Sequence, residues 1–296
     1  MSLFQAARMA VGAAKVAKNA ANYVKTQNTA KHNAQEHPVP AGYEHLMAFG
    51  TILYEKYGQT SLAATGQDQD TVRASLASSW NITDYNGAAQ TLAWLRDGGH
   101  RVEYGPYVAA ALYDQTKDAS AAPPPKVSFA DSLKNAYGSK ESKAAFQQEY
   151  WQQYIAGLPG YVQAFYNTVP DAKDIVNCVA TIRYALKHCS ELPVEVFNAT
   201  QNVDAWDIER IGIVVRLSFE SGYLAEGEAY QWLGVAEQMA RASYRSWQQY
   251  CAAWLLGRAF WCKDASMFVN EQAVTSIDHV REELRKNTVW QTYPLG

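Results

Sequence analysis

Cysteine is scarce in this chain, and its spacing does not match a zinc-binding motif. Only four of the 296 residues are cysteines, and none forms a CxxC arrangement. They fall into two pairs about three helical turns apart, which is too far for a disulfide within one straight helix. The four residues are Cys178, Cys189, Cys251 and Cys262. We expect small buried side chains in a reducing compartment, and neither a metal nor a cofactor.

The chain also lacks a strong net charge and any long apolar run. Its formal net charge of −3 argues against a nucleic-acid binder that acts through overall charge. The longest apolar runs, IGIVV and AAWLLG, are far shorter than the ~20 residues that cross a bilayer. The N-terminus has no concentrated apolar stretch of the kind found in a secretory signal. We expect a cytoplasmic protein, with attachment to a membrane surface or export without a cleaved signal as alternatives.

Strand-like alternation of β-branched residues is scarce too, whereas helical spacing recurs along most of the chain. We expect an all-α protein, an irregular multi-helix bundle with a central buried helix. The expected helices cover 43–57, 72–80, 83–97, 131–138, 142–158, 171–189, 204–221, 223–240, 244–261 and 271–286. Thr83 is the expected cap of the third, which ends at Gly98 and Gly99.

The domain organisation follows from the N-terminal composition and from one group of prolines. Residues 1–40 are interpreted as a basic amphipathic arm and a linker, and residues 41–296 as a single helical domain. Three consecutive prolines at 123–125 break helical structure and predict a loop near 115–128. This loop either lies within the one domain or separates two.

The N-terminal arm places its basic residues on one side of a helix. These residues are Arg8, Lys15, Lys18 and Lys25, and no acidic residue precedes Glu36. The other side carries mainly alanine and valine, which bury little area and anchor weakly in a membrane. Packing of this side on the protein body is therefore favoured. Contact with a membrane or a partner, or a role in secretion targeting, remain the alternatives.

The segment from Asp204 to Ser221 contains an acid and a base one helical turn apart between two apolar faces. Asp204 is the expected cap of this helix. On a helical wheel, Glu209, Arg216 and Glu220 share one gap between the apolar faces, which we interpret as the solvent side. Asp207 and Arg210 share the other gap. We expect them to form a buried ion pair, or alternatively the floor of a cleft in which the arginine binds an anion.

A second helix carries a stripe of large side chains at steps of four and three. The stripe consists of Trp247, Cys251, Trp254, Arg258 and Trp261. This spacing is typical of a helix that packs into a core. An arginine among aromatic rings needs a carboxylate or a ring to stack on. If Arg258 converges with Arg210, the two would form a candidate anion-binding cleft with Asp207 and Trp247.

Three of these segments together resemble the bacterial domain-of-unknown-function family numbered 1266. They read SSWNITDYNGAAQTLAWLRDGGHR, AWDIERIGIVVRLSFESGYLAEGEAYQWL and SYRSWQQYCAAWLLGRAFW. The residues that carry the resemblance are Trp80, Gly98 or Gly99, Asp207, Arg210, Gly222, Tyr223, Tyr244, Trp247, Gly257, Arg258 and Trp261. The resemblance covers roughly residues 75–262. It implies a bacterial, mostly helical, soluble protein and no established activity, so it supplies no catalytic residue.

Three classes of function fit this pattern. The first is a non-enzymatic protein-interaction or regulatory module, because no catalytic constellation is recognisable. The second is an enzyme or toxin-like effector whose arginine-containing cleft acts on an anionic substrate. The third is a membrane-peripheral protein recruited by its N-terminal helix. We expect another protein as the partner, with an anionic ligand or a membrane surface as alternatives.

Overall fold

The computed structural model describes residues 32, 35–52, 59–63, 65–113, 151–261 and 268–296, the last range by its backbone alone up to residue 272. Every regular element in these ranges is a helix, so the all-α prediction is confirmed. The elements are η1 (Glu44–Ala48), α2 (Gln69–Trp80), α3 (Tyr85–Asp97), α4 (Arg101–Tyr104), η3 (Gly105–Tyr107), α5 (Val108–Ala111), α8 (Gly160–Thr168), α9 (Ala172–Leu186), α10 (Val194–Asn198), α11 (Asp204–Glu220), α12 (Glu226–Ser243), α13 (Trp247–Trp261), α14 (Phe268–Lys286) and α15 (Thr288–Thr292).

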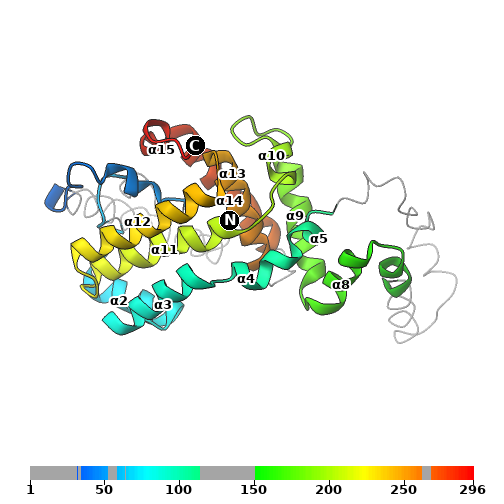
Figure 1. Ribbon diagram of the computed structural model, residues 1–296, viewed down its shortest axis with the longest axis horizontal. Coiled ribbons are helices and arrows are strands. Elements are labelled where there is room, and N and C mark those ends of the chain that lie inside the picture. Colours follow the sequence, from blue (N-terminus) through cyan, green and yellow to red (C-terminus); the bar gives the residue numbers. More distant parts are fainter. Residues whose placement is uncertain (1–31, 33–34, 53–58, 64, 114–150, 262–267) are drawn as a thin grey trace, which may run out of the picture.

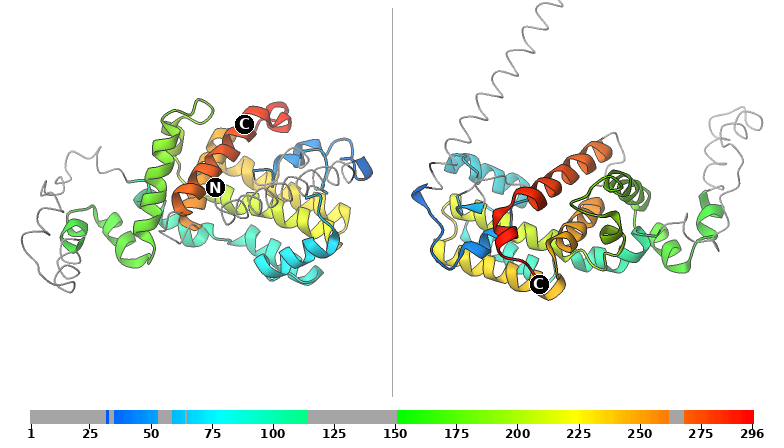
Figure 2. Two further views of the ribbon diagram at one scale, coloured as in Figure 1. Left: turned by 180° about the vertical axis from the view of Figure 1, so that it is seen from behind. Right: turned by 90° about the horizontal axis from the view of Figure 1, so that it is seen from above.

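Helix α11 is the centre of the fold. It packs against α12, α3, α13 and α2, and Figure 1 shows it running alongside α12 with α2 and α3 on its other side. Every residue from Ala205 to Ser218 is buried except the half-buried Arg210. The expected central buried helix is therefore present. Helices α9 and α14 lie side by side at the edge of this group, as both views in Figure 2 show.

The helix expected at 43–57 is wrong in the part that the structure describes. Only the short 3-10 helix η1 forms, and the chain then turns at Gly50, where φ is +76°. A Cβ on Gly50 would lie 2.5 Å from the carbonyl carbon of Gly212, because the two backbones touch. The segment bends to cross α11 at this glycine pair, and helical spacing alone does not reveal such a crossing.

The other helices are close to their expected positions. Helices α2, α3, α9, α11, α13 and α14 each cover most of the predicted range. The cap of α3 differs by one residue, since the Asp84 side chain, and not that of Thr83, accepts from the Gly87 amide at 2.8 Å. The cap of α11 also differs: its N-cap is Val203, and Asp204 is the first helical residue.

Several predictions fall wholly or partly outside the described residues. The basic positions Arg8, Lys15, Lys18 and Lys25, the loop at 115–128 and Cys262 belong to this group. The division into domains therefore stays a prediction. The other three cysteines are buried. No helix within the described ranges has the length and apolar character to span a bilayer.

Candidate functional site: a row of tryptophans and arginines

The prediction that Glu209, Arg216 and Glu220 lie on the solvent side of α11 is wrong. Glu209 and Arg216 are fully buried. Glu209 accepts from the Ile52 amide at 2.8 Å and from the Tyr250 hydroxyl at 2.9 Å. Described residues between 47 and 65, namely 47–52, 59–63 and 65, contact this side of the helix. Their backbone groups outside regular helices find partners among the side chains of α11.

Arg216 and Glu220 continue this contact along the same side of α11. Arg216 donates to the carbonyls of Met47, Phe49 and Ser61 at 3.2, 3.0 and 2.8 Å. Glu220 accepts from the Thr65 amide at 2.7 Å and from the Thr65 hydroxyl. The three charged side chains therefore hold residues 47–52, Ser61 and Thr65 against α11, and their role is structural.

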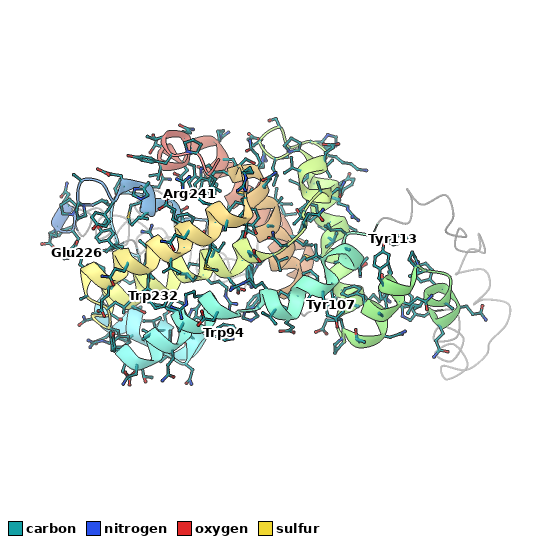
Figure 3. The ribbon with its side chains drawn as sticks, viewed as in Figure 1. Trp94, Tyr107, Tyr113, Glu226, Trp232 and Arg241 are labelled. Atoms are coloured by element: carbon teal, nitrogen blue, oxygen red, sulfur yellow. The ribbon has the colours of Figure 1, made fainter. Side chains whose placement is uncertain are left out.

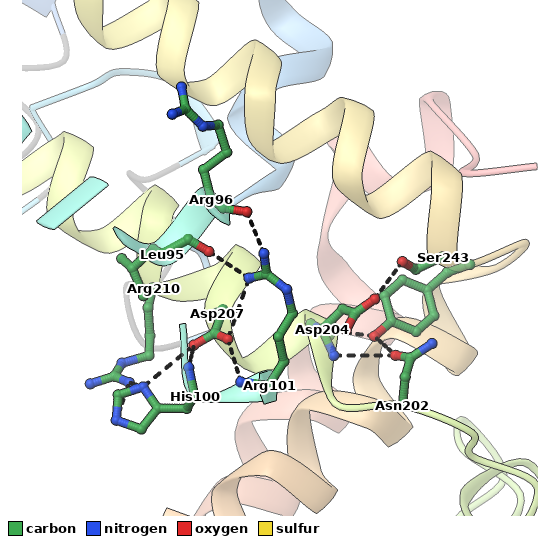
Figure 4. Close-up of polar contacts among 11 residues, drawn as sticks. Leu95, Arg96, His100, Arg101, Asn202, Asp204, Asp207, Arg210 and Ser243 are labelled. Carbon is green, nitrogen blue, oxygen red and sulfur yellow. Dashed lines mark hydrogen bonds and ion pairs between the residues drawn. The ribbon is translucent and has the colours of Figure 1, made fainter. Parts of the chain in front are cut away.

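On the opposite side, Asp207 holds the turn between α3 and α4. Its side chain is fully buried and accepts from the backbone amides of His100 at 3.1 Å and Arg101 at 2.8 Å (Figure 4). The Arg101 guanidinium lies 3.5 Å from the same carboxylate. Gly99, at φ +62°, passes so close that a Cβ there would collide with Asp207. The Asp207 carboxylate is thus used to bind the α3–α4 turn.

Arg210 does not form the expected ion pair with Asp207. Its guanidinium lies 4.6 Å from the centroid of the Trp80 ring and 5.2 Å from that of Trp206. Its Nη1 lies 2.6 Å from Nδ1 of His100. A guanidinium can only donate, so Nδ1 of His100 is the acceptor. Among the described residues, Arg210 makes no ion pair with a carboxylate.

Burial affects the charge of Arg210. Desolvation among the tryptophan rings lowers the pKa of this guanidinium, and the Asp207 charge and Tyr104 act in the opposite direction. An arginine stays protonated despite such a shift. The protein therefore keeps a partly desolvated positive charge at this place.

A continuous row of rings and cations extends from Arg210 in both directions. Towards α3, the His100 ring meets Trp94 edge-on at 4.9 Å between centroids. Towards α13, Arg258 lies 6.0 Å from the Trp206 centroid and 4.8 Å from that of Trp261. We call this set the tryptophan–arginine row. Its members are Trp80, Trp94, His100, Trp206, Arg210, Arg258 and Trp261.

The row is open at its ends and closed in its middle. Trp94, labelled at the end of α3 in Figure 3, is 46% exposed and Trp261 is 43% exposed. Trp206 between them is 4% exposed, and its Nε1 has no hydrogen-bond partner in the described part of the chain. Gly257 makes the middle possible, since a Cβ at this position would collide with Trp206.

The four residues of the predicted cleft do not all meet. Arg210 and Arg258 both pack on Trp206, as their convergence required. Trp247 lies at the other end of α13, about 16 Å along the helix axis, where it stacks on Trp290 at 4.5 Å. Its Nε1 donates to the Tyr293 carbonyl at 3.1 Å, so its role here is packing.

Sequence reasoning did not single out His100, Trp94 or Trp206 as site residues. The only available signal was local: the sequence GGHR places a histidine directly after the glycines that end α3. The contact of His100 with Arg210 joins residues 110 positions apart. No spacing within one segment predicts such a contact.

A comparison with protein families places the chain in one family. The model of the family described as protein of unknown function DUF1266 matches residues 75–295. The chain belongs to the DUF1266 family. The match continues beyond the expected limit of 262 through α14 and α15. Neither a curated protein nor a solved structure matches the chain.

Most of the residues on which the resemblance to DUF1266 rested lie in or beside the tryptophan–arginine row. Trp80, Arg210, Arg258 and Trp261 belong to the row itself. Three more position it, namely Gly99 and Asp207 at the α3–α4 turn and Gly257 under Trp206. DUF1266 carries no described activity, so the function must be argued from the chemistry of the row.

Proposed function

We propose that this protein is a non-enzymatic binding module, and that its tryptophan–arginine row receives an acidic side chain of a partner protein. One observation carries the proposal: Arg210 is a half-buried cation with no ion-pair carboxylate among the described residues. A partly desolvated charge that no carboxylate contacts directly is costly, even with the Asp207 charge nearby. An incoming carboxylate relieves that cost and accepts hydrogen bonds from the planar guanidinium.

Asp207 does not take this place, although it is only one helical turn away. Its oxygens accept two backbone amides and lie beside the Arg101 guanidinium. Turning towards Arg210 would leave the buried amides of the α3–α4 turn without acceptors. The fold itself therefore prevents Asp207 from forming an ion pair with Arg210.

The surroundings of Arg210 favour a protein partner. Exposed Trp94 and Trp261 stand at the two ends of the row. Tryptophan and arginine are the residue types most enriched where binding energy concentrates in protein interfaces. The guanidinium is also held between two indole rings, so little conformational freedom is lost when a partner binds.

The enzyme alternative rests on His100, whose side chain is 21% exposed. Its neighbours Arg210 and Asp207 could orient an imidazole for proton transfer to an anionic substrate. An enzyme would also need a nucleophile or a second acid–base group, and the contacts within the row supply none. Binding is therefore the better-supported function.

The test measures binding of the full-length protein to an array of labelled acidic dodecapeptides and to matched peptides with Asn and Gln in place of Asp and Glu. We expect the acidic peptides to bind, and Arg210→Gln to weaken them about tenfold or more, the effect of losing a charge-assisted hydrogen bond. Trp94→Ala should weaken them as well. Arg96→Gln, which removes an exposed arginine paired with Asp97, is the matched control.

Two outcomes would overturn the proposal. One is equal binding of acidic and neutral peptides, and the other is unchanged binding by the Arg210→Gln variant. Competition by inorganic phosphate at micromolar concentration would point to a small-anion site and so to the enzyme alternative.

A further inference from the structure

A second site lies away from the row, at the junction of α12 and α13. A cavity of about 570 Å³ opens between residues 193–202 and the turn that links these helices. Its volume is within the range of small-molecule sites. Beneath it, the Tyr244 hydroxyl accepts from the Ala205 amide at 2.8 Å, and Ser243 donates to Asp204 at 2.7 Å. The Ser243–Asp204 contact is drawn in Figure 4, and both contacts tie the lining of the cavity to the start of α11.

Three amide side chains in the lining each use either the oxygen or the NH₂ group in a hydrogen bond within the protein. The other polar group of each amide has no such bond among the described residues. The Asn202 oxygen accepts from the Tyr244 hydroxyl at 2.5 Å and from the Asp204 amide at 3.2 Å. The Gln249 oxygen accepts from the Arg245 amide at 2.8 Å. Both side chains therefore retain their NH₂ donors.

In Gln201 the NH₂ group, and not the oxygen, makes the hydrogen bond within the protein. Its Nε2 donates to the Ala199 carbonyl at 2.9 Å, so its oxygen remains as an acceptor. Glu195 adds further acceptors to the lining, and the Gln248 amide adds both kinds of group. The cavity thus offers donors and acceptors side by side on positioned side chains.

The charge of the lining excludes an anionic ligand. Glu195 is its only charged residue. The neighbouring Arg245 directs its guanidinium to the backbone carbonyls of Arg241 and Tyr244. A phosphate or carboxylate would meet one negative charge and no cation, so the ligand is neutral.

Two common modes of peptide recognition do not fit this cavity either. The described residues offer no strand edge for an added strand. The only aromatic residue in the lining, Tyr244, is 4% exposed and cannot form a groove for proline-rich segments. The mixed donors and acceptors of the lining favour a compact neutral ligand with many hydroxyl groups, each of which both donates and accepts.

We propose that this cavity binds a neutral carbohydrate of one or two rings. The oriented amides of Gln201, Asn202 and Gln249 bind its hydroxyl groups, and Glu195 accepts from a further hydroxyl. The wall formed by Pro193, Val196 and Ala199 packs against the C–H face of a ring. This site is independent of the proposed peptide binding at Arg210.

Saturation-transfer NMR on the full-length protein tests this inference with sucrose, maltose, cellobiose, trehalose and N-acetylglucosamine as probes. We expect saturable transfer to at least one of them. Gln248→Ala removes an exposed amide of the lining that makes no hydrogen bond among the described residues and would bind a further hydroxyl of the sugar. This change should weaken binding about three- to tenfold, the effect of one lost hydrogen bond. Ala199→Trp should abolish binding by filling the cavity while leaving every polar group in place.

Gln238→Ala, the same change at an exposed position of α12 outside this cavity, should leave binding unchanged. The inference is overturned if none of the five sugars binds, or if Ala199→Trp binds them as the parent protein does. Tighter binding of glucose 6-phosphate than of every neutral sugar would also overturn it, because the lining would then favour an anion.

Discussion

Nη1 of Arg210 lies 2.6 Å from Nδ1 of His100, while Asp207, one turn away on the same helix, binds the backbone of the α3–α4 turn. The acid and the base that the sequence suggested as a pair thus contact different groups. Asp207 fixes a turn, and Arg210 remains a cation among aromatic rings. This separation makes the row a candidate binding site and not a closed internal ion pair.

Gly99→Ala should destabilise the protein strongly. The residue has φ +62°, and its Cβ would collide with the buried Asp207 carboxylate. We expect a loss of about 2–4 kcal/mol in the free energy of unfolding, measured by urea denaturation. Gly227→Ala is the matched control, because a Cβ there meets nothing within 4 Å and Gly227 lies in α12. That variant should be equally or more stable, and a loss as large as that of Gly99→Ala would contradict the steric argument.

Arg216→Met should destabilise more than Arg210→Met. Arg216 is fully buried and satisfies carbonyls of three residues, which methionine would leave without donors. We expect a loss of about 3–5 kcal/mol for Arg216→Met. For Arg210→Met the loss should be smaller, since the side chain is half-buried and its polar partner His100 is partly solvated. Equal losses in urea denaturation would show that Arg210 is a structural residue like Arg216.

Stability should fall as the pH rises from about 4.5 to about 7. Burial raises the pKa of Glu283 to about 7, and hydrogen bonds from Asn287 and Thr51 only partly offset this. Burial raises the pKa of Glu209 as well. Because the folded state then binds more protons than the unfolded state, these groups stabilise the fold at low pH, and that contribution is lost through this window.

The variant Glu283→Gln isolates the contribution of this residue. It retains hydrogen-bonding capacity and cannot ionise, so its unfolding free energy should depend less on pH, by at most about 3 kcal/mol between pH 4.5 and 7.5. Unfolding by urea at a series of pH values measures the difference. The same pH dependence in parent and variant would remove Glu283 as its source.

Deleting residues 1–35 tests the N-terminal arm. We favour packing of its apolar side on the body, so the truncated protein should fold but unfold at a slightly lower temperature, about 2–4 °C for each kcal/mol lost. Both forms should bind anionic vesicles equally. Binding by the full-length form alone would instead establish Arg8, Lys15, Lys18 and Lys25 as a membrane-contacting surface.

The sequence by itself determined the fold class, the positions of most helices and the central place of α11. These features depend on interactions within one segment: helical spacing of apolar residues, caps and terminal glycines. The helical wheel of α11 also revealed two polar gaps between its apolar faces. Local spacing carries this information because residues three and four apart share a face.

Only the tertiary structure decided what each gap contacts. Glu209 and Arg216 were expected to face solvent, but they contact the backbone of Phe49, Ile52 and Ser61. The Gly50–Gly212 contact interrupts an expected helix. The row likewise depends on three segments meeting at Trp206 and Arg210. Most of these contacts join residues more than a hundred positions apart, and Arg258 and Trp206 are 52 positions apart. No helical period relates residues at such separations, so only the packing of the chain determines these contacts.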